Sequence, residues 1–150
     1  MPRNPESDAR KKYLAKLLES RIGELDRPHP SRPDWYSSID GIIHVFFTDS
    51  KPHFDRRPWF DMKLSDIYEL ANQDAGFVIF VLGDKDNFLV IPATSLRAKL
   101  ENYRPGPQAM AEGRYHFNLH GRTFEQLKDW DLKPYAQNWE LIPARPKNPN

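Results

Sequence analysis

Two apolar runs separated by a turn dominate the pattern of hydrophobic and polar positions. Residues 77–82 and 88–91 flank residues 83–87, which are Gly, Asp, Lys, Asp and Asn. Short apolar runs that are rich in aromatic and β-branched residues and bounded by turn residues are typical of buried strands. A five-residue link that contains Gly is compatible with a hairpin. The pattern therefore predicts a central β-hairpin around which the rest of the chain packs.

An amphipathic pattern precedes this hairpin near the amino terminus. Asn4-Pro5 is typical of a helix start, with Asn as the N-cap and Pro at the first helical position. Apolar residues then recur at helical spacing from Tyr13 to Leu25. We expect an amphipathic helix over residues 6–24, in a segment 1–27. Its apolar stripe either docks on the sheet or forms a homodimer.

The other periodic segments predict an α+β domain over residues 28–143. Strands are expected at 42–48, 114–120, 122–127 and 139–142, and short helices are expected with Ser65 and with Thr94 or Ser95 as their caps. This order differs from the regular alternation of a doubly wound fold. We expect a mostly antiparallel sheet of five or six strands with about three helices packed against it. Residues 144–150 should be frayed.

Composition narrows the class of protein without indicating a ligand. The 150 residues carry 22 Lys and Arg against 21 Asp and Glu, so no strong overall field attracts nucleic acid or membranes. There is no cysteine, which excludes disulfides and thiolate chemistry. No apolar run approaches the length of a membrane span, and no signal-peptide core follows Met1. We expect a soluble, cytoplasmic protein without a membrane partner.

Residues 49–63 combine positive charge with aromatic rings in a segment interrupted by two prolines, which predicts a loop. Lys and Arg can neutralise phosphates, and Trp can stack on an unpaired base. The candidate nucleic-acid-binding residues are Lys51, His53, Arg56, Arg57, Trp59 and Lys63. The alternative is a solvated loop that Trp59 anchors and whose arginines pair with neighbouring aspartates.

A nuclease is the enzymatic alternative. Metal-dependent nucleases of the PD-(D/E)xK type place one acidic residue on a strand and an acidic-x-Lys pair on the next, and the carboxylates hold a divalent ion that activates water. Asp40, Asp61 and Lys63 have an acceptable spacing for this arrangement. Mg²⁺ is the expected cofactor under this alternative, and none is expected otherwise.

No metal site is predicted among the histidines. His116 and His120 share one face of the predicted strand 114–120. Four residues of strand span roughly 13 Å, so the two rings cannot bind one ion. His116 is expected on an exposed, polar strand face.

Five short motifs stand out along the chain: Asp40-Gly41, residues 76–78 with 81–83, residues 88–92, Tyr115-His116-Phe117 and residues 131–135. Together they resemble a poorly characterised bacterial module that accompanies restriction-type and HNH endonucleases. The resemblance covers roughly residues 38–142, and most of its motifs are core and turn residues. It implies an association with DNA restriction or defence by analogy, and no HNH nuclease motif occurs in this chain.

Three functional hypotheses follow from the sequence. The leading one is a small DNA-binding or DNA-associated module that uses the basic, aromatic segment 51–63. The second is the divalent-metal nuclease built on Asp40, Asp61 and Lys63. The third is a non-enzymatic interaction protein that docks a partner or forms a homodimer through the N-terminal helix.

Overall fold

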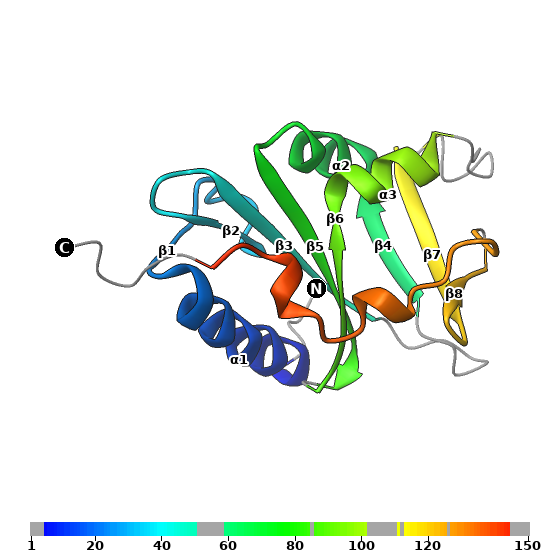
Figure 1. The fold of residues 1–150 in the computed structure, drawn as a ribbon, viewed down its shortest axis with the longest axis horizontal. Helices are drawn as coiled ribbons and strands as arrows, with labels where there is room; N and C mark the ends of the chain where they lie inside the picture. The colour runs from blue at the N-terminus through cyan, green and yellow to red at the C-terminus, as the bar shows by residue number, and fades with distance from the viewer. Residues whose placement is uncertain are drawn as a thin grey trace.

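The computed structural model describes residues 5–50, 59–84, 86–101, 111, 113–125 and 127–144 (Figure 1). Its helices are α1 (Pro5–Ile22), α2 (Leu64–Ala71) and α3 (Ala93–Leu100). Its strands are β1 (Leu25–Asp26), β2 (Trp35–Ser38), β3 (Ile43–Asp49), β4 (Trp59–Lys63), β5 (Ala75–Asp84), β6 (Asn87–Pro92), β7 (Arg114–His120) and β8 (Thr123–Phe124). Two 3-10 turns follow, η1 (Lys133–Tyr135) and η2 (Trp139–Leu141). The predicted α+β class is confirmed.

The strands form two sheets rather than the one that was predicted. A five-stranded sheet has the order β1-β2-β3-β5-β6, and a three-stranded sheet has the order β4-β7-β8. The predicted central hairpin is β5–β6, which pairs Ile79 with Val90. Strands β3 and β5 are parallel and every other pairing in both sheets is antiparallel, as expected for a mostly antiparallel fold.

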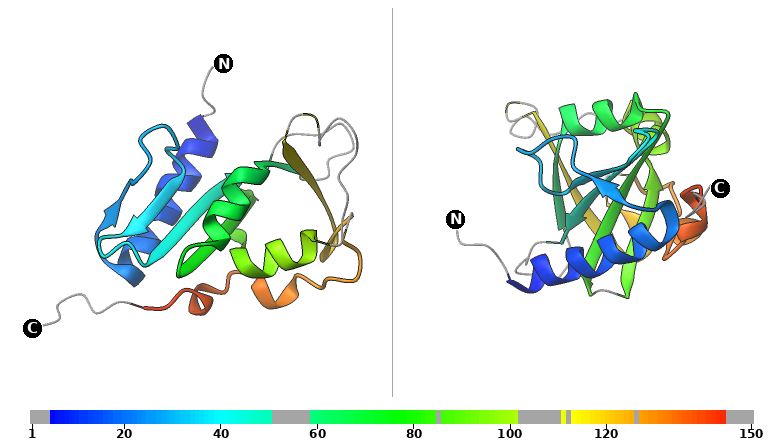
Figure 2. Two further views of the ribbon diagram at one scale, coloured as in Figure 1. Left: turned by 90° about the horizontal axis from the view of Figure 1, so that it is seen from above. Right: turned by 90° about the vertical axis from the view of Figure 1, so that its left-hand side faces the viewer.

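The five-stranded sheet is buried on both faces, which explains its nearly continuous apolar strands. On one face, Leu14 and Leu18 of α1 belong to the same buried cluster as Val45 of β3 and Ile79 of β5. The opposite face packs against α2, α3 and the three-stranded sheet. The view from above in Figure 2 shows α1 and strand β7 at opposite ends of the molecule. The three-stranded sheet is therefore left with one face away from this core.

One polar side chain inside the apolar strand β3 is satisfied by a strand that the sequence analysis missed. Trp35 of β2 donates from Nε1 to Nδ1 of His44 at 2.9 Å. The other ring nitrogen, Nε2, lies 2.8 Å from the carbonyl oxygen of Gly41. A carbonyl oxygen only accepts, so Nε2 of His44 carries the proton. This pair lets a histidine occupy a buried strand without a charge.

Several local predictions were wrong. Residues 59–63 were expected to end a loop and instead form strand β4. The last predicted strand, at 139–142, is the 3-10 turn η2 followed by buried Ile142. The N-cap of helix α2 is Lys63 instead of the predicted Ser65, and the N-cap of α3 is Pro92 instead of Thr94 or Ser95.

The remaining predictions concern the ends of the chain and membranes. The apolar stripe of α1 packs on the sheet, which is the first of the two roles predicted for it. The predicted frayed tail, apart from Ala144, lies outside the described residues. Among the helices of the described ranges, none has the length and apolar character that crossing a bilayer requires.

Candidate nucleic-acid interface

Strand β4 carries the part of the candidate segment that the structure describes. Its residues alternate between the two faces of the sheet. Phe60 and Met62 are buried in the core, whereas Trp59, Asp61 and Lys63 are partly or fully exposed. Two of the three carry a charge. The alternation gives β4 one apolar face and one face that combines an aromatic ring with charged groups.

Four of the six predicted nucleic-acid-binding residues cannot be placed. Lys51, His53, Arg56 and Arg57 lie outside the described residues. They precede Trp59 by two to eight residues in the sequence.

Strand β7 pairs with β4 and extends this face. The register sets Asn118 opposite Trp59, His116 opposite Asp61 and Arg114 opposite Lys63. In β7, Tyr115 and Phe117 are buried, as the alternation of the sequence predicts. We call the surface formed by Trp59, Asp61, Lys63, Arg114, His116 and Asn118 the β4–β7 face.

A small network of contacts orders the β4–β7 face. Arg114 donates from Nη1 to Oδ2 of Asp61 at 2.9 Å. His116 Nε2 lies 3.5 Å from Oδ1 of the same carboxylate. The rings of Trp59 and His116 meet with centroids 5.6 Å apart and planes at 61°. Asp61 therefore fixes the positions of a guanidinium and an imidazole, and the imidazole supports the indole ring.

The exposed fractions of these side chains determine which of them can contact a ligand. The side chain of Asp61 is 13% exposed, compared with 33% for Arg114 and 38% for His116. The carboxylate is therefore mostly covered by its partners, while the cation and the imidazole remain open to solvent. Lys63 is exposed at the end of the strand. The cationic groups and the rings of the face are therefore accessible to a ligand, whereas the Asp61 carboxylate is mostly covered by its partners.

Two pockets adjoin this face at Asp61. They measure about 360 Å³ and 200 Å³, and both are lined by Asp34, Phe46 and Asp61. The larger pocket also contains Asp49, whose Oδ2 is 2.6 Å from Arg10 Nη2. Asp34 lies 3.2 Å from Lys11 Nζ. Asp34 and Asp49 of this pocket are thus each paired with a cation from α1.

The smaller pocket contains a buried acid, Asp66. Burial raises the pKa of Asp66, and the nearby charges of Arg32 and Lys63 oppose this rise. Arg32 Nη1 lies 3.4 Å from Oδ1 of Asp66 and also pairs with Glu69. A carboxyl in this setting takes up a proton more readily than an exposed one.

The three residues of the nuclease hypothesis do not share one pocket. Asp61 and Lys63 line the smaller pocket together. Asp40 lies in the turn before β3, where its Oδ1 accepts hydrogen bonds from Ser38 Oγ at 2.5 Å and from the Ile42 amide at 3.0 Å. It lines neither of the two pockets that contain Asp61. Within the described ranges, no group of three or more His, Asp or Glu side chains is placed to hold a metal ion.

Sequence reasoning missed the partners of Asp61. Arg114 and His116 are more than fifty residues away in the sequence, and only the β4–β7 pairing brings them to it. It also missed Asp34 and Asp49, although Asp49 directly follows the predicted strand 42–48. Its position could have indicated a site residue, because a side chain at the end of a buried strand lies at the edge of the core.

Comparisons of this chain with protein-family models, with curated proteins and with solved structures find no match.

Proposed function

We propose that this protein binds single-stranded DNA through the β4–β7 face. The observation that carries the proposal is a sheet face on which the Trp59 ring contacts His116 opposite Asn118, with Lys63 and Arg114 along the same strands. An indole ring can stack on an unpaired base of any sequence. Lys and Arg side chains can contact the phosphates of the same strand.

A single strand fits this face better than a duplex does. Bases in a duplex are stacked on one another, so their faces cannot reach Trp59. Duplex recognition commonly inserts a helix or a two-stranded ribbon into the major groove. The β4–β7 face belongs to a three-stranded sheet whose other face is buried against the core. Stacking of unpaired bases on Trp59 is the contact that such a surface supports.

We expect charge to contribute less than base stacking to the affinity for single-stranded DNA. Lys63 and Arg114 supply two positive charges, and Asp61 supplies one negative charge beside Arg114. For single strands, the logarithm of affinity falls by about 0.7 for each phosphate contact per logarithm of salt. Two contacts therefore predict a shallow slope of about −1.4. A contribution from Lys51, Arg56 and Arg57 would make the slope steeper, which is how their role can be measured.

The test is fluorescence anisotropy with a labelled oligothymidine and a hairpin duplex of the same length. Trp59→Leu should lose roughly 1–3 kcal/mol of binding free energy for the oligothymidine, because it removes the stacking ring. Trp59→Phe should retain most of the affinity. Lys63→Gln should reduce the salt slope by about 0.7. Lys133→Gln changes an exposed lysine of η1 and is the matched control.

Asp61 separates this proposal from the nuclease alternative. Asp61→Asn removes the negative charge beside Arg114, so binding of the oligothymidine should become a few-fold tighter. The same samples are incubated with Mg²⁺ and run on a gel. Strands shortened by the wild type and left intact by Asp61→Asn would support the nuclease instead. Absence of binding at low salt, or equal binding by Trp59→Leu, would overturn the proposal. The association with restriction or defence stays a prediction.

A further inference from the structure

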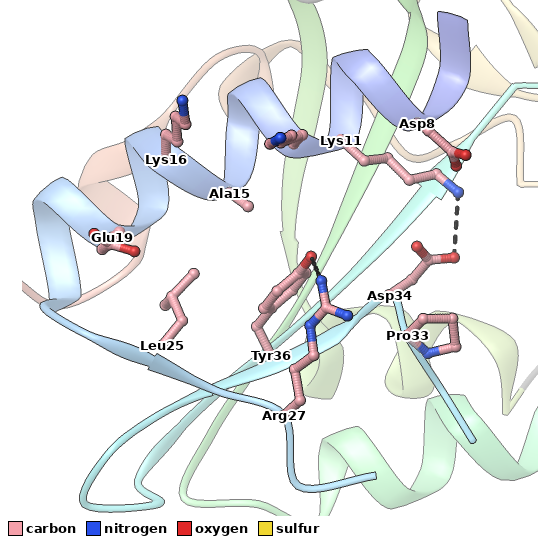
Figure 3. Close-up of a pocket in the computed structure, with 11 residues that line it drawn as sticks. Asp8, Lys11, Ala15, Lys16, Glu19, Leu25, Arg27, Pro33, Asp34 and Tyr36 are labelled. Atoms are coloured by element: carbon pink, nitrogen blue, oxygen red, sulfur yellow. Dashed lines mark hydrogen bonds and ion pairs between the residues drawn. The ribbon is translucent and has the colours of Figure 1, made fainter. Parts of the chain in front are cut away.

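A groove of about 720 Å³ separates α1 from strands β1 and β2 (Figure 3). This volume is within the range of small-molecule sites, roughly 300–1,000 Å³. Helix α1 contributes residues at helical spacing, among them Lys12, Ala15 and Lys16. Ala15 is buried, and its small side chain leaves space at the centre of the groove. The groove shares no residue with the β4–β7 face, although Asp8, Lys11 and Asp34 also line the larger pocket that adjoins this face at Asp61.

The opposite wall holds a positioned donor pair, Arg27 and Tyr36. Arg27 Nη2 donates to the Tyr36 hydroxyl oxygen at 2.9 Å, and the guanidinium carbon lies 5.0 Å from the centre of the Tyr36 ring. The same ring packs edge-to-face against Phe47 in the core, with centroids 5.7 Å apart. Figure 3 shows the Tyr36 hydroxyl directed toward α1. Because this oxygen accepts from Arg27, its own proton can be donated to a bound group.

Three cations of the groove have no carboxylate partner among the residues that the structure describes. Lys11 pairs with Asp34 at 3.2 Å. Lys12, Lys16 and Arg27 form no ion pair within the part of the chain that the structure describes. Two lysines, a guanidinium and a phenol hydroxyl thus line one groove. Figure 3 shows the Lys16 ammonium directed away from Tyr36, so this flexible side chain has to turn toward the groove to contact a ligand. A phosphate group has enough acceptor oxygens to bind several of these donors together, and bonds to its charged oxygens are the strong kind.

Acidic side chains in the same groove constrain the rest of the ligand. Asp8 and Glu19 also line it, about three helical turns apart on α1. These carboxylates would repel a second negative charge and would accept hydrogen bonds from hydroxyl groups. Leu25 adds apolar surface beside them.

We propose that this groove binds a phosphate monoester that carries hydroxyl groups, as sugar phosphates and nucleoside monophosphates do. Lys12, Lys16 and Arg27 bind the phosphate, with the Tyr36 hydroxyl as a further donor. Asp8 and Glu19 lie on opposite sides of these lysines along α1, and the carboxylate on the side that the sugar occupies accepts hydrogen bonds from its hydroxyl groups. This site is independent of single-stranded DNA binding, which uses other residues.

The test is isothermal titration calorimetry with ribose 5-phosphate, inorganic phosphate and ribose as probes. Ribose 5-phosphate should bind more tightly than inorganic phosphate, and ribose alone should give no heat. The double variant Lys12→Gln, Lys16→Gln should weaken ribose 5-phosphate binding at least about tenfold, because two charge-assisted bonds are lost. Ala15→Leu should also abolish binding by filling the groove. Lys128→Gln together with Lys133→Gln, both exposed and outside the groove, should leave it unchanged.

Three outcomes would overturn the proposal. The first is no heat with ribose 5-phosphate up to about 10 mM, a range in which even weak sites bind. The second is equal binding of inorganic phosphate and ribose 5-phosphate, which would indicate only attraction between charges. The third is unchanged binding in the double lysine variant, whose exposed positions should leave the fold intact. The double lysine variant should bind oligothymidine as the wild type does, so this proposal and the DNA proposal can fail separately.

Discussion

At the scale of single residues, the buried acid Asp66 links stability to pH. It is only 6% exposed, and burial raises its pKa above the usual 3.8 while Arg32 and Lys63 oppose the rise. Between 3.8 and the raised value, the folded protein keeps a proton that the unfolded chain has released. The contribution of Asp66 to the free energy of unfolding therefore falls as pH rises through this interval and is constant above it.

Asp66→Asn removes this proton linkage and keeps the shape of the side chain. We expect the variant to gain stability relative to the wild type as pH rises from about 3 to 7, with most of the gain just above pH 3.8. Arg32 keeps its pairing with Glu69 in the variant. Urea unfolding at a series of pH values measures the difference, with Asp129→Asn as an exposed control. A difference that is constant or decreasing over this range would contradict the prediction.

At the scale of elements, the sequence pattern predicted those helices and strands that are determined by residues close together in the chain. The apolar runs identified the β5–β6 hairpin, and strict alternation identified β7 at its observed bounds, Arg114–His120. Strand β4 was missed because it is short and follows a proline, so its alternation was assigned to a loop. The parallel pairing of β3 with β5 was not predicted, because α2 and β4 lie between them in sequence.

In the candidate site too, the residues of one segment were predicted from the sequence, whereas their partners from a distant strand were not. Trp59, Asp61 and Lys63 were recognised from residue type within one segment. Their partners on β7 were known only as outward-facing strand residues. Which strand pairs with β4 depends on packing of the whole core, and no local pattern encodes that.

The contact of α2 with β5 provides a test at the same scale. A Cβ added at Gly76 would overlap the carbonyl oxygen of Leu70 and lie 2.8 Å from its carbonyl carbon. These are backbone atoms at the end of α2, so relief requires the helix and β5 to separate. We expect Gly76→Ala to lower the free energy of unfolding by about 1–3 kcal/mol, as overpacking does. Urea unfolding measures it, with exposed Asp74→Ala as the control. An unchanged midpoint would show that the helix end adjusts freely.

At the scale of the whole molecule, the use of α1 within the chain bears on the dimer hypothesis. Leu14, Leu18 and Ile22 are buried on the five-stranded sheet, and the large apolar side chains that α1 leaves exposed are Tyr13 and Leu17, at 39% and 36%. A stable interface buries at least about 1,000 Å² in total. Two partly exposed side chains supply a small part of that area, so we do not expect α1 to form a dimer interface.

Light scattering after size exclusion, over a wide range of protein concentration, tests this expectation with two matched variants. Leu18→Ala should keep the mass of the wild type and cost about 2–5 kcal/mol of stability, because it leaves a cavity between α1 and the sheet. Leu17→Glu should change neither mass nor stability by much. If the wild type is a dimer that Leu17→Glu disperses while remaining folded, the exposed side of α1 is an interface. The two leucines are adjacent in sequence and face opposite environments, so the pair of variants separates packing within one chain from contact between chains.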